Sequence, residues 1–157
     1  MKRRIARCRR ILFSPPMNIA NHTGPISSVG KVWHVENIPH PRLSELITNF
    51  NVESPESKIS IPEDDSLSVR GWALSSRDQQ SRLHLVIRFA SHTVSHPMNV
   101  DRGDVIEKVL GAKPENHPQI RCGFDYSVPM NDALRGFEVG FEVGGYIYTA
   151  TKVFAKQ

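Results

Sequence analysis

The feature that most limits the fold of this chain is an alternation of apolar and polar side chains with a period of two. It is clearest in residues 82–90, RLHLVIRFA, where every second residue is apolar: Leu83, Leu85, Ile87 and Phe89. Successive side chains of a β-strand point to opposite faces of the sheet. The pattern is therefore typical of strands with one buried face and one wet face, as in antiparallel sheets.

Alternating segments recur throughout residues 58–157. They cover residues 58–62, 66–74, 82–90, 92–100, 122–128, 136–143 and 146–155. Gly144-Gly145 separates the last two and is typical of a two-residue hairpin turn. The sequence therefore predicts an all-β fold, an immunoglobulin-like antiparallel β-sandwich of about seven strands.

One segment interrupts this pattern. In residues 101–120, DRGDVIEKVLGAKPENHPQI, the apolar residues recur at helical spacing. Gly111 suits the end of a helix, and Pro114 prevents its continuation. We expect one short helix in a crossover between the sheets.

The chain before residue 58 has a different pattern. Residues 41–50, PRLSELITNF, place Leu43, Leu46, Ile47 and Phe50 on one face of a helix. We therefore expect an N-terminal arm at 31–57 with a short helix and a linker. Residues 58–157 form the predicted β-sandwich domain, which we expect to fold without the arm.

Positive charge is concentrated at the start of the chain. The net charge is +4, and six of the 20 basic residues fall within the first ten. The remaining 14 basic residues face 16 acidic ones, so the rest of the chain has no basic excess. Residues 1–30 are expected to be a disordered basic tail that can touch polyanions, whereas specific nucleic-acid binding is not expected. Met17 is an alternative start, so residues 1–16 need not belong to the native protein.

The expected location is the cytoplasm. No apolar run approaches the roughly 18–20 residues that span a bilayer. The short apolar run 11–13 is broken by Ser14-Pro15-Pro16, which is unlike a secretion signal. The two cysteines, Cys8 and Cys122, do not form a disulfide framework and fit a reducing compartment.

The sequence contains no recognisable catalytic constellation, and no cofactor is expected. His84, His92 and His96 raise the possibility of a metal site and a small metal-dependent hydrolase. However, four residues of extended strand span about 13 Å, too far for two ligands of one zinc ion. The same spacing argues against Glu138 and Glu142 as a glycosidase pair. Solvated strand faces are the simpler interpretation of both sets.

Three short motifs resemble a known family. They are Gly71-Trp72-Ala73, Arg102-Gly103-Asp104-Val105 and Gly123-Phe124. Over residues 58–157 the chain resembles the β-sandwich accessory module found beside bacterial glycosyltransferases and polysaccharide-synthesis enzymes. Gly103 departs from the family pattern, which commonly has proline there. The resemblance implies a non-catalytic module that binds a glycan or a glycosyltransferase partner. A protein–protein scaffold without sugar contact is the alternative.

Six residues are candidates for ligand contact. Trp72 either packs in the sandwich or offers a ring face to a sugar. The family resemblance draws attention to Arg102 and Asp104, which form either a structural ion pair or helix cap, or a ligand contact. The remaining candidate platform aromatics are Tyr126, Tyr146 and Tyr148.

Overall fold

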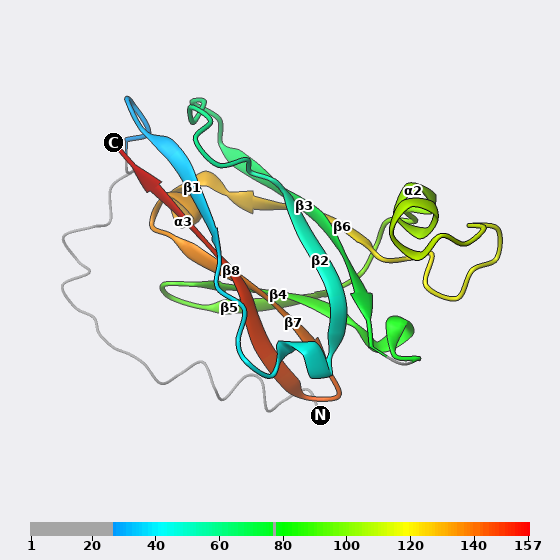
Figure 1. The fold of residues 1–157 in the computed structure, drawn as a ribbon. Coiled ribbons are helices and arrows are strands. Elements are labelled where there is room, and N and C mark those ends of the chain that lie inside the picture. Colours follow the sequence, from blue (N-terminus) through cyan, green and yellow to red (C-terminus); the bar gives the residue numbers. More distant parts are fainter. Residues whose placement is uncertain (1–26, 77) are drawn as a thin grey trace.

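The computed structural model describes residues 27–76 and 78–157, so the predicted basic tail lies almost wholly outside the described residues. Figure 1 shows the chain folded into two β-layers, with one helical segment projecting to the side. The strands are β1 (Val32–Asn37), β2 (Ile47–Ser54), β3 (Ser66–Ser75), β4 (His84–Phe89), β5 (Thr93–Pro97), β6 (Gly123–Pro129), β7 (Phe137–Val143) and β8 (Tyr146–Lys156). The helical elements are η2 (Leu43–Glu45), η3 (Gln80–Arg82), α2 (Gly103–Val105), η4 (Ile106–Leu110) and α3 (Met130–Leu134).

The strands form two antiparallel sheets. The larger sheet has the order β1-β8-β7-β4-β5, and the smaller has the order β2-β3-β6. Every pairing between these strands is antiparallel. This confirms the predicted all-β class and the antiparallel sheets. The described residues form eight strands, of which six lie in residues 58–157, where about seven were predicted.

The main core lies between the two sheets. Alternate residues of β3 and β4, among them Val69, Leu85 and Ile87, are completely buried. Rings from opposite sheets meet there, because the centroids of Phe124 on β6 and Phe141 on β7 are 6.0 Å apart. The alternation in the sequence thus corresponds to one face of each strand turned toward this core.

Gly71 is required where β3 crosses this core. A Cβ atom at this position would collide with the backbone oxygen of Asn51 on β2 and would lie 2.7 Å from Cζ of Phe124. Asn51 and Phe124 belong to the strands on either side of β3. The absence of a side chain at Gly71 therefore lets the Phe124 ring fill the space under the middle of the sheet.

The predicted helix at residues 41–50 is wrong. Only Leu43–Glu45 form a 3₁₀ turn, and β2 begins at Ile47. Leu43, Leu46 and Ile47 are buried, as the helical pattern required, but a turn followed by a strand buries them equally well. The β-branched residues of ITNFNV favour the strand.

Residues 31–57 contribute one strand to each sheet. β1 pairs with β8, and β2 pairs with β3. A boundary at residue 58 therefore separates β1 from its partner β8, and β2 from its partner β3. Residues 58–62, predicted as a strand, form no strand of their own. They lie along β1 through an isolated bridge between Ser60 and Val32 and a backbone bond from Trp33 N to Ile59 O at 3.0 Å.

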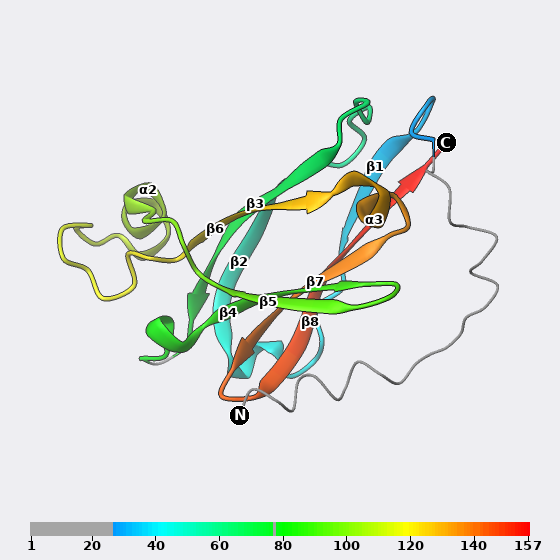
Figure 2. The same cartoon turned by 180° about the vertical axis from the view of Figure 1, so that it is seen from behind.

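The crossover helix was predicted correctly. Residues 103–110 are helical, and Gly111 ends the helix with a φ of 64° in the left-handed region. Figures 1 and 2 both show this segment projecting beyond the sheets. The turn at Gly144-Gly145 is also confirmed, with φ values of 60° and 91°. Among the described residues, no helix is long and apolar enough to cross a bilayer.

Candidate functional site

The six residues singled out in the sequence lie in three separate places. Trp72, Arg102 and Asp104 lie where α2 and η4 join the smaller sheet. Tyr126 lies at the side of the sandwich where β5 and β6 approach each other. Tyr146 and Tyr148 lie on β8, near the end of the sandwich formed by the β7–β8 hairpin.

Trp72 packs outside the space between the sheets. It pairs across the sheet with Gly123 on β6, and it is half-buried against a second, smaller apolar cluster. That cluster contains Leu74, Val105, Ile106 and Cys122. Trp72 therefore attaches the projecting helical segment to the sheet, whereas the tryptophan between the sheets is Trp33, which is 2% exposed.

Arg102 links this segment to β2. Its Nη1 and Nη2 atoms donate to the two carboxylate oxygens of Glu53 at 2.9 and 3.0 Å. Its Nε and Nη2 atoms donate to the carboxylate of Asp104, both at 2.9 Å. The side chain is 21% exposed, and its stem lies over Gly123, where a Cβ atom would approach Arg102 Cγ within 2.6 Å. All of these contacts hold parts of the fold together.

The hydrogen bonds and charges of this network shift the pKa values of its ionisable groups. The hydrogen bonds from Arg102 lower the pKa of Asp104 from 3.8 to about 2. The hydrogen bonds to Asp104 and then to Glu53 raise the pKa of Arg102. Nearby, burial raises the pKa of the Cys122 thiol to about 11, so this thiol stays protonated at neutral pH.

Tyr126 closes the side of the sandwich between β5 and β6. Its ring stacks on His96 of β5 with a centroid distance of 4.1 Å, and its hydroxyl donates to the backbone oxygen of Pro97. Burial, and secondarily the neighbouring His84, lowers the pKa of His96. The Tyr126 ring is thus covered by a protein side chain and does not form an open platform.

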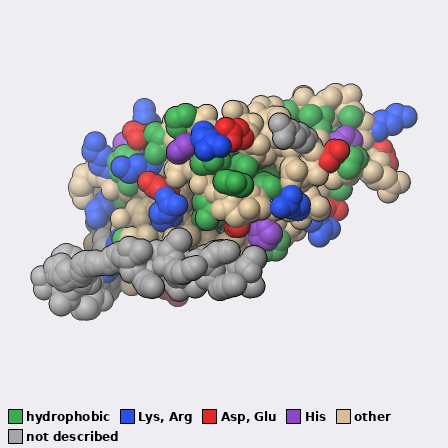
Figure 3. All heavy atoms as spheres, turned by 90° about the horizontal axis from the view of Figure 1, so that it is seen from below, with side chains coloured by type: hydrophobic (Ala, Val, Ile, Leu, Met, Phe, Trp, Pro, Cys, Tyr) green, Lys and Arg blue, Asp and Glu red, His purple; other side chains and the backbone are tan. Residues whose placement is uncertain are grey.

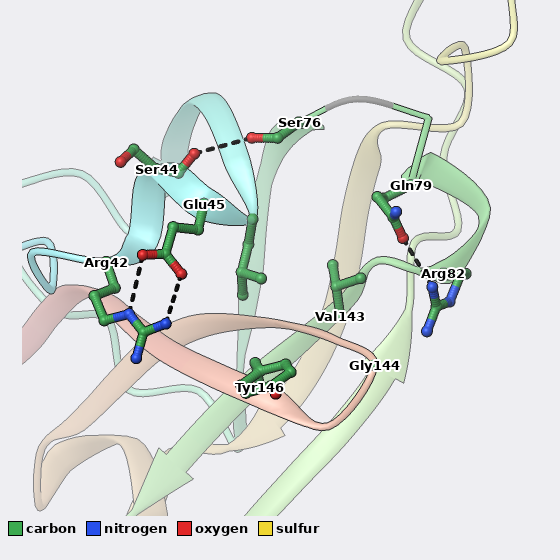
Figure 4. A pocket seen from close by; sticks show the side chains of 10 residues that line it. Arg42, Ser44, Glu45, Ser76, Gln79, Arg82, Val143, Gly144 and Tyr146 are labelled. Carbon is green, nitrogen blue, oxygen red and sulfur yellow. Dashed lines mark hydrogen bonds and ion pairs between the residues drawn. The ribbon is translucent and has the colours of Figure 1, made fainter.

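An open hollow of about 700 Å³ lies at the end of the sandwich (Figure 4). The β7–β8 hairpin, the η2 turn and the segment around η3 surround it. Its floor is apolar, because Leu46 and Val143 line it and both are buried. Val143 and Tyr146 face each other across the hairpin, so both side chains leave the same face of the sheet.

Two hydrogen-bonded pairs of planar polar groups lie on opposite sides of the hollow (Figure 4). On one side Arg42 donates from Nε and Nη2 to the two carboxylate oxygens of Glu45, at 3.0 and 2.9 Å. On the other side Arg82 donates to the amide oxygen of Gln79 at 3.0 Å. The hollow therefore offers guanidinium, carboxylate and amide groups around an apolar floor.

Backbone contacts fix the η2 wall of the hollow. Ser76 at the end of β3 donates from its backbone nitrogen to Leu46 O at 2.8 Å and from its hydroxyl to Ser44 O at 3.0 Å. These bonds hold the turn that carries Arg42 and Glu45 against the smaller sheet. A bond from His40 N to Thr149 O of β8, at 2.8 Å, attaches the start of the same segment to the larger sheet.

The two tyrosines of β8 differ in their surroundings. Tyr146 lines the hollow and is 62% exposed, the largest exposed aromatic surface among the described residues. Tyr148 is half-buried: His40 stacks on its ring at 4.7 Å, and the Arg42 guanidinium carbon lies 5.6 Å from its centroid. Tyr148 therefore supports the wall that carries Arg42, and Tyr146 is the accessible ring.

The histidines do not converge. His92 stacks on Phe89, whereas His96 stacks on Tyr126. Within residues 27–76 and 78–157, no group of three histidine, cysteine or acidic side chains is placed to share a metal ion. Glu138 and Glu142 also contact different groups, Arg88 and Ser95 respectively.

Of the six candidate ligand residues chosen from the sequence, only Tyr146 lines the hollow. Sequence reasoning missed Arg42, Glu45 and Gln79, which lie outside the alternating segments, and Arg82, which is only the first residue of one. A usable signal was present at Arg42 and Glu45, whose opposite charges are three residues apart on a short turn. Nothing in the sequence placed that turn beside the β7–β8 hairpin.

Comparisons with protein-family models, with curated proteins and with solved structures find no match to this chain. They therefore do not test the resemblance to the glycosyltransferase-associated module.

Proposed function

We propose that this protein is a non-catalytic, immunoglobulin-like binding module whose ligand is a carbohydrate held in the hollow at the end of the sandwich. The sequence resemblance suggests the setting, which is bacterial surface-polysaccharide synthesis beside a glycosyltransferase. The single observation that carries the proposal is the exposed ring of Tyr146 beside two sets of planar polar groups.

A sugar ring matches such a surface. One face of a pyranose presents C–H groups that pack on an aromatic ring, and its rim presents hydroxyl groups. Tyrosine offers an apolar body with a polar tip that can stay hydrated. Guanidinium, carboxylate and amide groups at the rim supply the donors and acceptors that hydroxyl groups need.

The size of the hollow agrees with this class of ligand. Small-molecule sites usually enclose about 300–1,000 Å³, and the hollow measures about 700 Å³. It is open to solvent, so it can accept part of a longer chain. The interspersed positive and negative side chains seen from below (Figure 3) are compatible with a polar ligand.

A protein partner is the second candidate function. The observation that favours it is the apolar surface of Val109 and Leu110 on the projecting segment, which are 37% and 38% exposed. Such a partner would contact η4 and leave the hollow free. The two functions therefore use different surfaces and can be tested separately.

The test is a glycan array followed by calorimetric titration of the sugars that bind. The variant Tyr146→Ala should abolish binding with little change in thermal stability, because the ring is mostly exposed. Tyr126→Phe is a matched aromatic control at the side of the sandwich and should bind as the wild type does. A wild-type protein that binds no glycan, or a Tyr146→Ala variant that binds normally, would contradict the proposal.

A further inference from the structure

Resting on the proposed carbohydrate function, we infer that the hollow prefers an acidic sugar and that Arg82 recognises its carboxylate. The class of ligand is a glycan containing hexuronic acid residues. The two arginines of the hollow, Arg42 and Arg82, differ in the groups to which they donate hydrogen bonds.

Arg42 is already neutralised. It makes a bidentate ion pair with Glu45, and both side chains remain more than half exposed. Arg82 donates instead to the uncharged amide of Gln79. In the described part of the chain Arg82 makes no ion pair, so its positive charge and most of its N–H donors remain available.

The segment that carries Arg82 is held firmly. Gln80, two residues before Arg82, is buried. Its amide oxygen accepts a hydrogen bond from Ser75 N at 2.9 Å, and its amide nitrogen donates to Ala73 O at 3.1 Å. Leu83, on the other side of Arg82, is 1% exposed and belongs to the main core. The backbone of Arg82 is thus fixed between two anchors, which lowers the entropy that binding would cost.

The hairpin turn leaves space for the Arg82 side chain. A Cβ atom at Gly144 would lie 2.8 Å from Nη2 of Arg82, so the guanidinium lies directly against a residue without a side chain. Gly144 also has a φ of 60°, which favours glycine. Tyr146 follows Gly144 by two residues and lines the same hollow. The Arg82 guanidinium and the Tyr146 ring therefore lie at the same rim.

These features together fit a carboxylated pyranose. The guanidinium fork matches a carboxylate with two parallel hydrogen bonds, which are stronger than bonds to a hydroxyl. The ring face of the same sugar can rest on Tyr146, and its hydroxyl groups can reach the Arg42–Glu45 pair. A neutral sugar would keep the ring and hydroxyl contacts and lose only the ion pair.

The experiment compares one sugar skeleton in two charge states. Short oligosaccharides of hexuronic acid are titrated into the full chain, and so are the same oligosaccharides with their carboxyl groups methyl-esterified. The wild type should bind the free acid about tenfold more tightly, and the difference should shrink as salt is added.

Variants then locate the preference. Arg82→Gln should bind the acid and the ester equally, at the affinity of the wild type for the ester. Arg88→Gln is the matched control, because Arg88 is a half-exposed arginine paired with Glu138 on the larger sheet. It should keep the full preference, and both variants should melt within a few degrees of the wild type.

The outcomes separate the two claims. Equal wild-type affinity for acid and ester overturns this inference and leaves the proposed function standing. A preference that Arg88→Gln reduces as much as Arg82→Gln also overturns it, because the effect would then be general charge attraction. If Tyr146→Ala loses binding to the acid and to the ester, the result supports the carbohydrate site itself. If the wild type binds no glycan, the result overturns both the proposed function and this inference.

Discussion

Arg102 and Glu53 form a bidentate ion pair, with Nη1–Oε1 and Nη2–Oε2 distances of 2.9 and 3.0 Å. They are 49 residues apart in the sequence. The pair joins the projecting helical segment to β2, an edge strand of the smaller sheet. We predict that Arg102→Leu lowers the free energy of unfolding by about 1–3 kcal/mol, because charged hydrogen bonds at a partly buried site are lost. Chemical denaturation measures this, and a double-mutant cycle with Glu53→Gln should show coupling.

Asp104 should make stability depend on pH in acid. Its pKa is about 2 in the folded protein and 3.8 as a reference, so the folded state holds the proton less tightly. The contribution of Asp104 is complete above about pH 4 and disappears as the pH falls toward 2. Thermal melts between pH 5 and 2 should show a smaller decline in Asp104→Asn than in the wild type. An equal decline in melting temperature in both proteins would mean that the Asp104–Arg102 ion pair does not contribute to stability.

The two tryptophans should respond differently to truncation. Trp33 is 2% exposed between the sheets, so Trp33→Ala should cost about 3–5 kcal/mol. Trp72 is half-buried against the helical segment, so Trp72→Ala should cost less, about 2 kcal/mol, because less surface returns to water. Urea denaturation compares the two. A larger loss at Trp72 would show that the helical segment is more central to stability than its position indicates.

Residues 58–157 should not fold cooperatively alone, which reverses the expectation from the sequence. The fragment lacks β1 and β2, and with them Trp33, Leu43, Leu46 and Ile47 of the main core. It would also leave the smaller sheet with only two strands, which are marginal without further packing. Calorimetric melting of the fragment tests this. A sharp, reversible transition would show that residues 31–57 are dispensable.

The strand alternation predicted much of the fold, and its failures have physical causes. Leu43, Leu46, Ile47 and Phe50 fit a helix by spacing, but pairing with β3 turned the second half of this segment into a strand. Local pattern cannot report such long-range pairing. Tyr146 was identified because tyrosine has an apolar ring and a hydroxyl that can stay hydrated, but Tyr126 and Tyr148 were identified for the same reason and do not line the hollow. Arg82 and Glu45 were not identified, because only the packing of distant segments brings them to one hollow.

His96 should destabilise the protein in mild acid. Burial lowers the pKa of His96 below its usual 6.5, so the unfolded chain binds the proton more readily. Stability is therefore full above about pH 6.5 and falls as the pH drops below it. The fall in melting temperature from pH 7.5 to 5.5 should be smaller in His96→Phe, which keeps an aromatic ring against Tyr126. An identical fall in both proteins would assign the effect to other histidines.

The measurement that tests the carbohydrate site most directly is amide chemical-shift mapping by NMR during titration with a glycan selected on the array. The amides that line the hollow should shift together and saturate at one affinity, among them Ser44, Ser76, Gln79, Gly144 and Tyr146. The amides of β4 and β5 on the larger sheet should stay in place. Shifts confined to residues 103–112, or to the outer face of the larger sheet, would contradict the account and place the ligand elsewhere.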